Sequence, residues 1–174
     1  RNTARNLLAN LYDFNPARDA VGYASLAELD RWALGRLAAL IKRCREAYEA
    51  YEFHVVYHAL NNFCSVDMSA LYFDIVKDRV YCSAAGSPER RSAQTAMHEV
   101  LSALARIVAP IMPFTADEVW RSMPGRGPDD CVFLCDFPAV QPEWADGELE
   151  RSAARERIGD ALRRILIVVE AGGA

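Results

Sequence analysis

The chain has 174 residues, of which 52% are hydrophobic and 25% are charged. This balance excludes a disordered chain, and the length suits one domain with at most a short appendage. The formal net charge is −4, so overall charge does not indicate nucleic-acid binding, and any surface for a polyanion must come from uneven placement of the basic residues.

The cysteines and the apolar segments indicate in which cellular compartment the protein is expected. The five cysteines have scattered spacings that do not suit a disulfide framework, which favours a reducing, cytoplasmic environment. We find no signal peptide and no apolar run of membrane-spanning length, so no membrane partner is expected. The missing initiator Met and the apolar run at residues 165–169 indicate a piece excised from a larger protein.

Two helices are predicted in the first third of the chain. Apolar residues at helical spacing predict the first over residues 1–11. Ser25 with Glu28 predicts a capping box that opens a second helix, which runs to about residue 51. The apolar residues of this second helix fall on one stripe, so one of its faces is expected to be buried.

The middle of the chain continues the helical pattern. A third helix is predicted over residues 53–64, and Asp67 is predicted to cap the next one. Ser87 and Pro88 supply a capping hydroxyl and a proline at the first helical position, which predicts a helix from there to about Val108.

Beyond that helix the pattern becomes less regular. Pro110 and Pro113 should end the helix, and Thr115 with Glu118 predicts another capping box. Cysteine and apolar residues from Cys131 onward predict a short strand or an extended strap.

The expected architecture is all-α. It is a bundle of five or six helices with a short extended or β appendage near residues 131–137, and a last helix is expected over residues 147–169. We expect residues 1–125 to form the bundle and residues 126–174 to form a strap and a C-terminal helix that packs on the bundle or follows it.

Basic residues on the second helix form the first candidate site. Five of them, with no acidic residue between the first and the last, are Arg31, Arg36, Lys42, Arg43 and Arg45. Trp32 beside them is suitable for stacking an unpaired base while the cations bind phosphates. The alternative is a solvated helix face with Trp32 packed on a neighbouring helix or domain. Arg90 and Arg91 open a later helix, where the dipole disfavours cations, so they are candidates for holding phosphate or a neighbouring domain, or are a plain exposed pair.

A group of polar residues separates two apolar helices: Asn61, Asn62, Asp67 and Ser69. Because buried amides and carboxylates need partners, this polar knot is expected to cap helix ends, with RNA contact as the alternative.

Metal-binding and catalytic patterns are weak. His54 and His58 have the spacing of two ligands on a helix, and Cys131 and Cys135 are also a close pair, but neither has the further ligands of a zinc site, so we expect no metal. Gly-rich phosphate loops and nucleophile elbows are missing, so no catalytic residue is assigned.

Two segments carry a resemblance to a known family. One segment is residues 61–79, which opens with Asn-Asn-Phe-Cys-Ser-Val-Asp-Met-Ser; the other is residues 104–120, which ends with Pro-Ile-Met-Pro-Phe-Thr-Ala-Asp-Glu-Val-Trp. Both resemble the anticodon-binding domain of class I aminoacyl-tRNA synthetases. The first segment is most similar to the bacterial isoleucyl enzymes, whereas the second is shared with valyl enzymes.

This resemblance implies a helical bundle that binds the anticodon stem and loop of tRNA. The parent would ligate isoleucine to its tRNA with ATP and Mg²⁺ and would supply a catalytic domain as a second partner. The two ATP-binding signatures and the C-terminal zinc module of the family have no match here, so this chain is expected to be non-catalytic. A valyl-type synthetase and a helical protein-interaction module without RNA binding are the alternatives.

Overall fold

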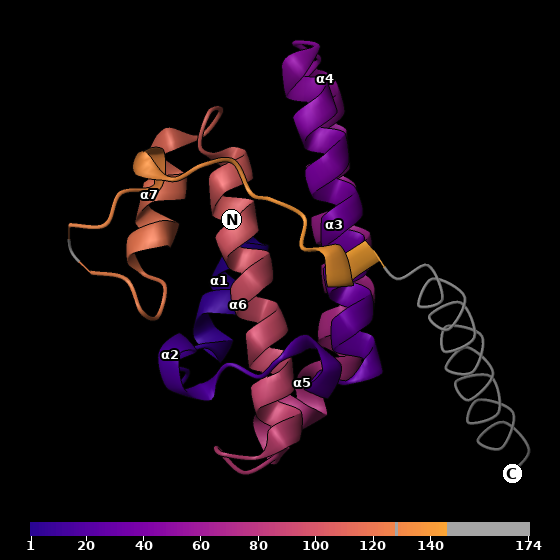
Figure 1. Ribbon diagram of the computed structural model, residues 1–174, viewed down its shortest axis with the longest axis vertical. Helices are drawn as coiled ribbons and strands as arrows, with labels where there is room; N and C mark the ends of the chain where they lie inside the picture. Colours follow the sequence, from indigo (N-terminus) through magenta and orange to yellow (C-terminus); the bar gives the residue numbers. More distant parts are fainter. Residues whose placement is uncertain (128, 146–174) are drawn as a thin grey trace, which may run out of the picture.

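The computed structural model describes residues 1–127 and 129–145, and in this part of the chain helix follows helix without a strand (Figure 1). This confirms the predicted all-α bundle. The helix expected over residues 147–169 lies outside the described residues. The elements in chain order are α1 (Asn2–Asn10), α2 (Pro16–Asp19), η1 (Tyr23–Ser25), α3 (Glu28–Glu49), α4 (Phe53–Asn62), η2 (Phe63–Tyr72), α5 (Phe73–Cys82), α6 (Pro88–Val108), α7 (Pro113–Arg121), η3 (Val132–Leu134) and η4 (Pro142–Ala145).

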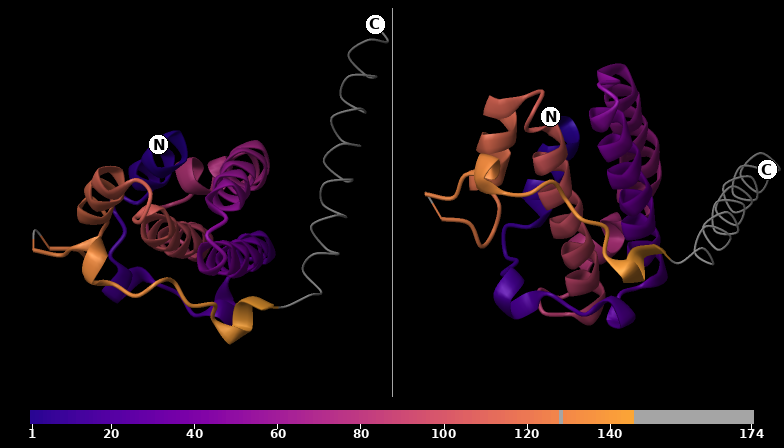
Figure 2. Two further views of the ribbon diagram at one scale, coloured as in Figure 1. Left: turned by 90° about the horizontal axis from the view of Figure 1, so that it is seen from above. Right: turned by 45° about the horizontal axis from the view of Figure 1, so that its top comes forward.

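The core lies between α3, α6 and the helices around them. Seen from above, the longer helices stand side by side around a common interior (Figure 2). Side chains from α3 and α6 that are at most 1% exposed include Leu37, Ile41, Met97, Val100 and Leu101. Burying each side chain of this size contributes about 1.5–3 kcal/mol. Because these residues recur at helical spacing, their burial determines which face of each helix is left for solvent.

The elements α4, η2 and α5 follow one another without an interruption, and η2 is a π-helix. The sequence predicted a break here, with Asp67 capping a new helix. That prediction was wrong: Asp67 lies inside η2, is 3% exposed, and its Oδ2 pairs with Arg36 Nη2 at 3.2 Å. A partner on another helix satisfies the carboxylate, so it is not needed at a helix end.

The residues predicted to cap the first turn of a helix do so in α6 but not in α3 or α7. Ser87 Oγ accepts a hydrogen bond from the Arg90 N–H at 3.3 Å, and Pro88 is the first residue of α6, as predicted. The capping boxes predicted at Ser25 and Thr115 do not form: α3 has Ala27 as its N-cap, and α7 begins at Pro113, each without a side-chain cap.

The physical reasons differ between these two helices. Ser25 belongs to the 3₁₀ turn η1, and the N–H of Ala27 instead donates to Ser92 Oγ of α6 at 2.8 Å. Pro113 occupies the first position of α7, where its missing N–H leaves no unpaired donor, so the helix begins before Thr115 can act as a cap.

The last described segment crosses the bundle as an extended strap, residues 131–141, from α7 toward α3 (Figure 1). Its regular structure is the single 3₁₀ turn η3, so the alternative of a short strand is wrong for this part of the chain. The strap leads to η4, where Trp144 is 7% exposed, and a Cβ at Gly35 of α3 would lie 3.4 Å from Trp144 O. The division at residue 125 stays a prediction.

Helix length and polarity decide whether a membrane could be crossed. Within residues 1–127 and 129–145, every helix is too short or too polar to cross a lipid bilayer. The five cysteines all lie in this part of the chain and are free thiols.

Candidate nucleic-acid interface

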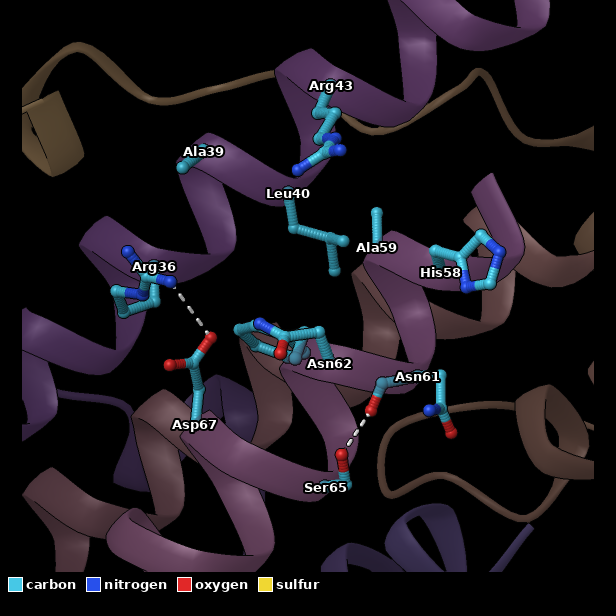
Figure 3. A pocket seen from close by; sticks show the side chains of 11 residues that line it. Arg36, Ala39, Leu40, Arg43, His58, Ala59, Asn61, Asn62, Ser65 and Asp67 are labelled. Atoms are coloured by element: carbon cyan, nitrogen blue, oxygen red, sulfur yellow. Dashed lines mark hydrogen bonds and ion pairs between the residues drawn. The ribbon is translucent and has the colours of Figure 1, made fainter. Parts of the chain in front are cut away.

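A polar cleft of about 550 Å³ lies between α3 and the consecutive helices α4 and η2 (Figure 3). Its α3 side carries Arg36, Ala39, Leu40 and Arg43; its other side carries His58, Ala59, Asn61, Asn62, Phe63, Ser65 and Asp67. Most of the polar residues on that second side are three or four positions apart, so they share one face of the helical rod. This face, opposite two arginines, makes the cleft suitable for a polar, anionic ligand.

Charge in the polar cleft is dominated by arginine. Asp67 is the one acidic residue among those that line it, and it is buried and paired with Arg36 (Figure 3). Arg43 has an exposed side chain and makes no hydrogen bond or ion pair with the described residues. The lining therefore has a surplus of positive charge, although the chain as a whole is acidic.

The two asparagines of the polar knot are both exposed but point in different directions (Figure 3). Asn62 lies toward Arg36 and Asp67, and Asn61 directs its amide away from that pair. Successive residues on a helix are about 100° apart, which explains the difference. An exposed amide offers both donors and an acceptor to a ligand.

The structure does not bring the four residues of the polar knot together as one set of caps. Asp67 makes the ion pair across to α3, and Ser69 Oγ donates to Cys64 O, five residues earlier in the π-helix, at 2.8 Å. The serine and the aspartate therefore have structural roles, whereas Asn61 and Asn62 are left for contact with a ligand.

The other cations of α3 divide into two kinds. Lys42 is exposed and, like Arg43, makes no hydrogen bond or ion pair with a described residue. Arg45 holds the strap: its Nη2 donates to Pro138 O at 2.9 Å, and its guanidinium lies 5.0 Å from the centre of the Phe137 ring. Arg31 is partly buried near the start of α3. Lys42 and Arg43 are thus the cations of α3 best placed for a phosphate.

Trp32 does not fit its predicted role as a stacking platform. Its side chain is 5% exposed and belongs to the hydrophobic core, so no face of the indole is open to a base. Other parts of the bundle pack against the side of α3 that carries Trp32 and bury it. The sequence of a single helix does not show this packing.

Arg90 and Arg91 also leave the set of phosphate candidates. Arg90 is 7% exposed, and its Nη2 donates to Asp13 Oδ1 at 3.1 Å and to Tyr12 Oη at 3.2 Å. Arg91 pairs with Asp13 at 3.7 Å and with Asp19 at 3.4 Å. Acidic residues of the N-terminal segment thus compensate two cations at an unfavourable helix position.

These contacts are reflected in the acidity of the two aspartates. Partial burial acts to raise the pKa of Asp13, but hydrogen bonds from Gln94 and Arg90 and the nearby arginine charges outweigh it and lower the pKa. The pKa of Asp19 is lowered to about 2, mainly by the hydrogen bond from Arg18. Both carboxylates therefore stay charged at neutral pH and keep Arg90 and Arg91 paired.

The part of the chain that the structure describes has no prepared metal site. Within these residues, no three His, Cys, Asp or Glu side chains come together to hold a metal ion. His54 and His58 are both exposed on α4, and Cys131 and Cys135 are free thiols. The ATP, Mg²⁺ and zinc that the family resemblance implies are expected of the parent and are not assigned to these residues.

The sequence interpretation missed His58 and Ser65 as lining residues of the polar cleft. Together with Asn61 and Asn62 they repeat at helical spacing from α4 into η2, which is the signal that could have revealed a polar face.

A bundle of helices with a cationic, amide-lined cleft defines the chain as a candidate RNA-binding domain, and comparison with known proteins identifies its family. The family model described as the anticodon-binding domain of tRNA ligase matches residues 30–171, and the chain belongs to this family.

Relatives narrow the comparison further. The chain is 49% identical over 170 residues to a protein of Moorella thermoacetica named isoleucine–tRNA ligase, a match that covers 95% of this chain and 18% of that protein. Proteins of the same name from Geobacter sulfurreducens and Caldicellulosiruptor bescii are 52% identical over 155 and 144 residues, covering 89% and 82% of this chain and 17% and 16% of those proteins. The resemblance predicted from the sequence is confirmed, and the chain spans less than a fifth of the length of these relatives.

Proposed function

We propose that this chain recognises the anticodon arm of an isoleucine tRNA as part of an isoleucine–tRNA ligase. The observation that carries the proposal is the exposed Arg43 in the lining of the polar cleft, with the exposed Lys42 next to it in α3. The acidic residue of the cleft, Asp67, is buried and paired. Such an arrangement attracts a phosphate backbone even though the net charge of the chain is negative.

The mechanism is positioning. Lys42 and Arg43 bind phosphates of the loop, and the exposed amide of Asn62 in the polar cleft tests a base by hydrogen bonds. Arg36 is held by Asp67 at 3.2 Å and keeps α3 and η2 in register, so the amide and the cations retain their spacing. The ligation chemistry, with ATP and Mg²⁺, belongs to a catalytic domain of the same ligase that lies outside this chain.

A charge reversal tests the RNA surface. The double variant Lys42→Glu/Arg43→Glu should bind labelled isoleucine tRNA about tenfold more weakly or worse in filter binding. The slope of log affinity against log salt should fall by about 0.7 for each phosphate of a single-stranded loop that the variant no longer neutralises. The matched control is Lys77→Glu/Arg121→Glu, which changes the net charge equally at exposed positions of α5 and α7.

Two outcomes would end the proposal. Unchanged affinity of the Lys42/Arg43 variant would remove the surface, and an equal loss in both double variants would reduce binding to a general charge effect. Competition between unlabelled isoleucine and valine tRNAs then decides the amino-acid identity: we expect isoleucine tRNA to compete at a lower concentration, and the reverse order favours a valyl-type enzyme.

A further inference from the structure

A second cavity, of about 280 Å³, lies between α1, α4, α6 and α7, and its lining is mainly apolar. We refer to it as the apolar slot. It is lined by Arg1, Thr3, Ala4, Tyr57, Leu60, Asn61, Cys64, Leu101, Leu104, Ala105, Val108, Ile111, Met112, Thr115, Ala116 and Val119. None of these residues is acidic, so the slot does not repel an anionic ligand.

Size and lining indicate the kind of ligand. Sites for small molecules have volumes of about 300–1,000 Å³, mostly apolar walls and a few polar groups that set orientation. The apolar slot, of about 280 Å³, lies just below this range, so it suits one ring system. Aliphatic side chains of α6 and α7 provide apolar surface, and Tyr57 contributes an aromatic ring that is 63% exposed. Thr3 and Asn61 supply hydrogen-bonding groups.

Asn61 connects this slot to the polar cleft, because it lines both cavities. The two cavities lie on different sides of α4, and the amide of Asn61 is directed away from Arg36 and Asp67 (Figure 3). A helix with its side chains is about 10–12 Å across. An RNA loop held by its backbone at Arg43 can therefore pass over α4 and present a base on the other side.

We propose that the apolar slot takes one unstacked nucleobase of the RNA loop, and this inference rests on the proposed function. The base is removed from water against the aliphatic side chains and Tyr57, and the amide of Asn61 forms hydrogen bonds with its polar edge. The polar cleft then holds the backbone and tests one base with Asn62, and the slot reads a second base, so the specificity of the domain depends on both sides of α4.

The test combines protein variants with RNA hairpins that carry the anticodon-arm sequence of an isoleucine tRNA, each with one loop nucleotide replaced by an abasic residue. Ala4→Phe fills the apolar slot, and Ala9→Phe adds the same ring to an exposed position of α1 as a control. Stacking of a base contributes enough that its loss should weaken binding about tenfold. We expect this loss for Ala4→Phe with the intact hairpin and not for Ala9→Phe.

The pattern across the hairpins is the decisive result. The affinity of the unmodified chain should fall about tenfold for the hairpin with one particular abasic position. The affinity of Ala4→Phe should fall no further for that hairpin, because the variant has already lost the contact with that base. Asn61→Ala, a change at an exposed residue, should reduce the abasic effect at the same position. If Ala4→Phe melts at a lower temperature than Ala9→Phe, its weaker binding could reflect a damaged fold. The result for Asn61→Ala alone then tests whether the slot reads a base.

Failure of this inference is distinguishable from failure of the proposed function. If Ala4→Phe and Asn61→Ala bind every hairpin as the unmodified chain does, while Lys42→Glu/Arg43→Glu still binds weakly, then the RNA surface stands and the slot does not read a base. If the unmodified chain binds no hairpin, both proposals are overturned.

Discussion

Arg79 donates two parallel hydrogen bonds to the buried carboxylate of Asp30, from Nη1 to Oδ2 and from Nη2 to Oδ1, both at 3.0 Å. Tyr72 Oη and Ser92 Oγ donate to the same carboxylate at 2.8 and 2.5 Å. Asp30 is 0% exposed, so these donors replace water completely. This network joins α3, η2, α5 and α6 and fixes the helical rod that carries Asn61.

Removing the arginine from this network should destabilise the fold. Arg79→Leu leaves the Asp30 carboxylate buried without its cation, and breaking a buried pair in this way costs about 3 kcal/mol in the free energy of unfolding. Urea denaturation measures the change. Lys77→Leu on the same helix is the control, because Lys77 forms an exposed pair with Asp74 and its loss should change stability little. Equal stabilities of the two variants would contradict the prediction.

Gly125 should not accept a side chain. Its φ is +79°, and a Cβ there would lie 2.6 Å from Pro16 Cγ, so Gly125→Ala combines backbone strain with a clash between the loop after α7 and α2. We expect a loss of about 1–3 kcal/mol in the free energy of unfolding. Gly22→Ala is the control, since no atom lies within 4 Å of its Cβ position. A melting temperature of Gly125→Ala equal to that of the control would show that the loop moves freely away from α2.

Arg45 should hold the strap and contribute little to the stability of the bundle. Arg45→Ala removes the hydrogen bond to Pro138 O and the contact with the Phe137 ring, so amide hydrogens in residues 131–141 should exchange faster while those of α6 are unchanged. Lys42→Ala, three residues earlier on α3, should leave exchange in the strap as it is. Uniformly faster exchange in both variants would assign the effect to the helix instead of to the contact.

His98 should make the protein less stable in mild acid. Burial lowers the pKa of His98 below its ordinary value, and the centre of its ring lies 5.7 Å from the centre of the Phe14 ring. Below about pH 6.5 the unfolded chain therefore binds a proton that the folded chain does not, and the free energy of unfolding falls as pH falls through this window toward the folded-state pKa.

His98→Gln should remove this component, so the difference in urea midpoint between pH 7.5 and pH 5.5 should be smaller in the variant. Burial raises the pKa of Glu99, whose contribution to stability changes in the opposite direction with pH, but it is present in both proteins and cancels in the comparison. The same midpoint difference in the variant and the parent chain would exclude His98 as the cause.

Features that depend on a few neighbouring residues were predicted well. Ser87 and Pro88 begin α6 as expected, and the helix before Pro110 ends at Val108. These signals act through the backbone of the residues themselves: a capping oxygen and a ring that removes an N–H. The family resemblance was equally a property of the sequence, because each of the segments at residues 61–79 and 104–120 carries it without an interruption.

The roles of the charged and aromatic side chains were decided by residues far away in the chain. From the sequence, Asp67 is predicted to cap a helix, but in the structure it pairs with Arg36, 31 positions earlier. Arg90 is predicted to be an exposed cation, but it is buried and pairs with Asp13, 77 positions earlier. Trp32 suits a stacking platform until the bundle buries it. The sequence determined the helices and the family, because both depend on local patterns. The tertiary structure decided which cations remain open to a ligand, because the burial and pairing of a side chain depend on helices that only the fold brings together.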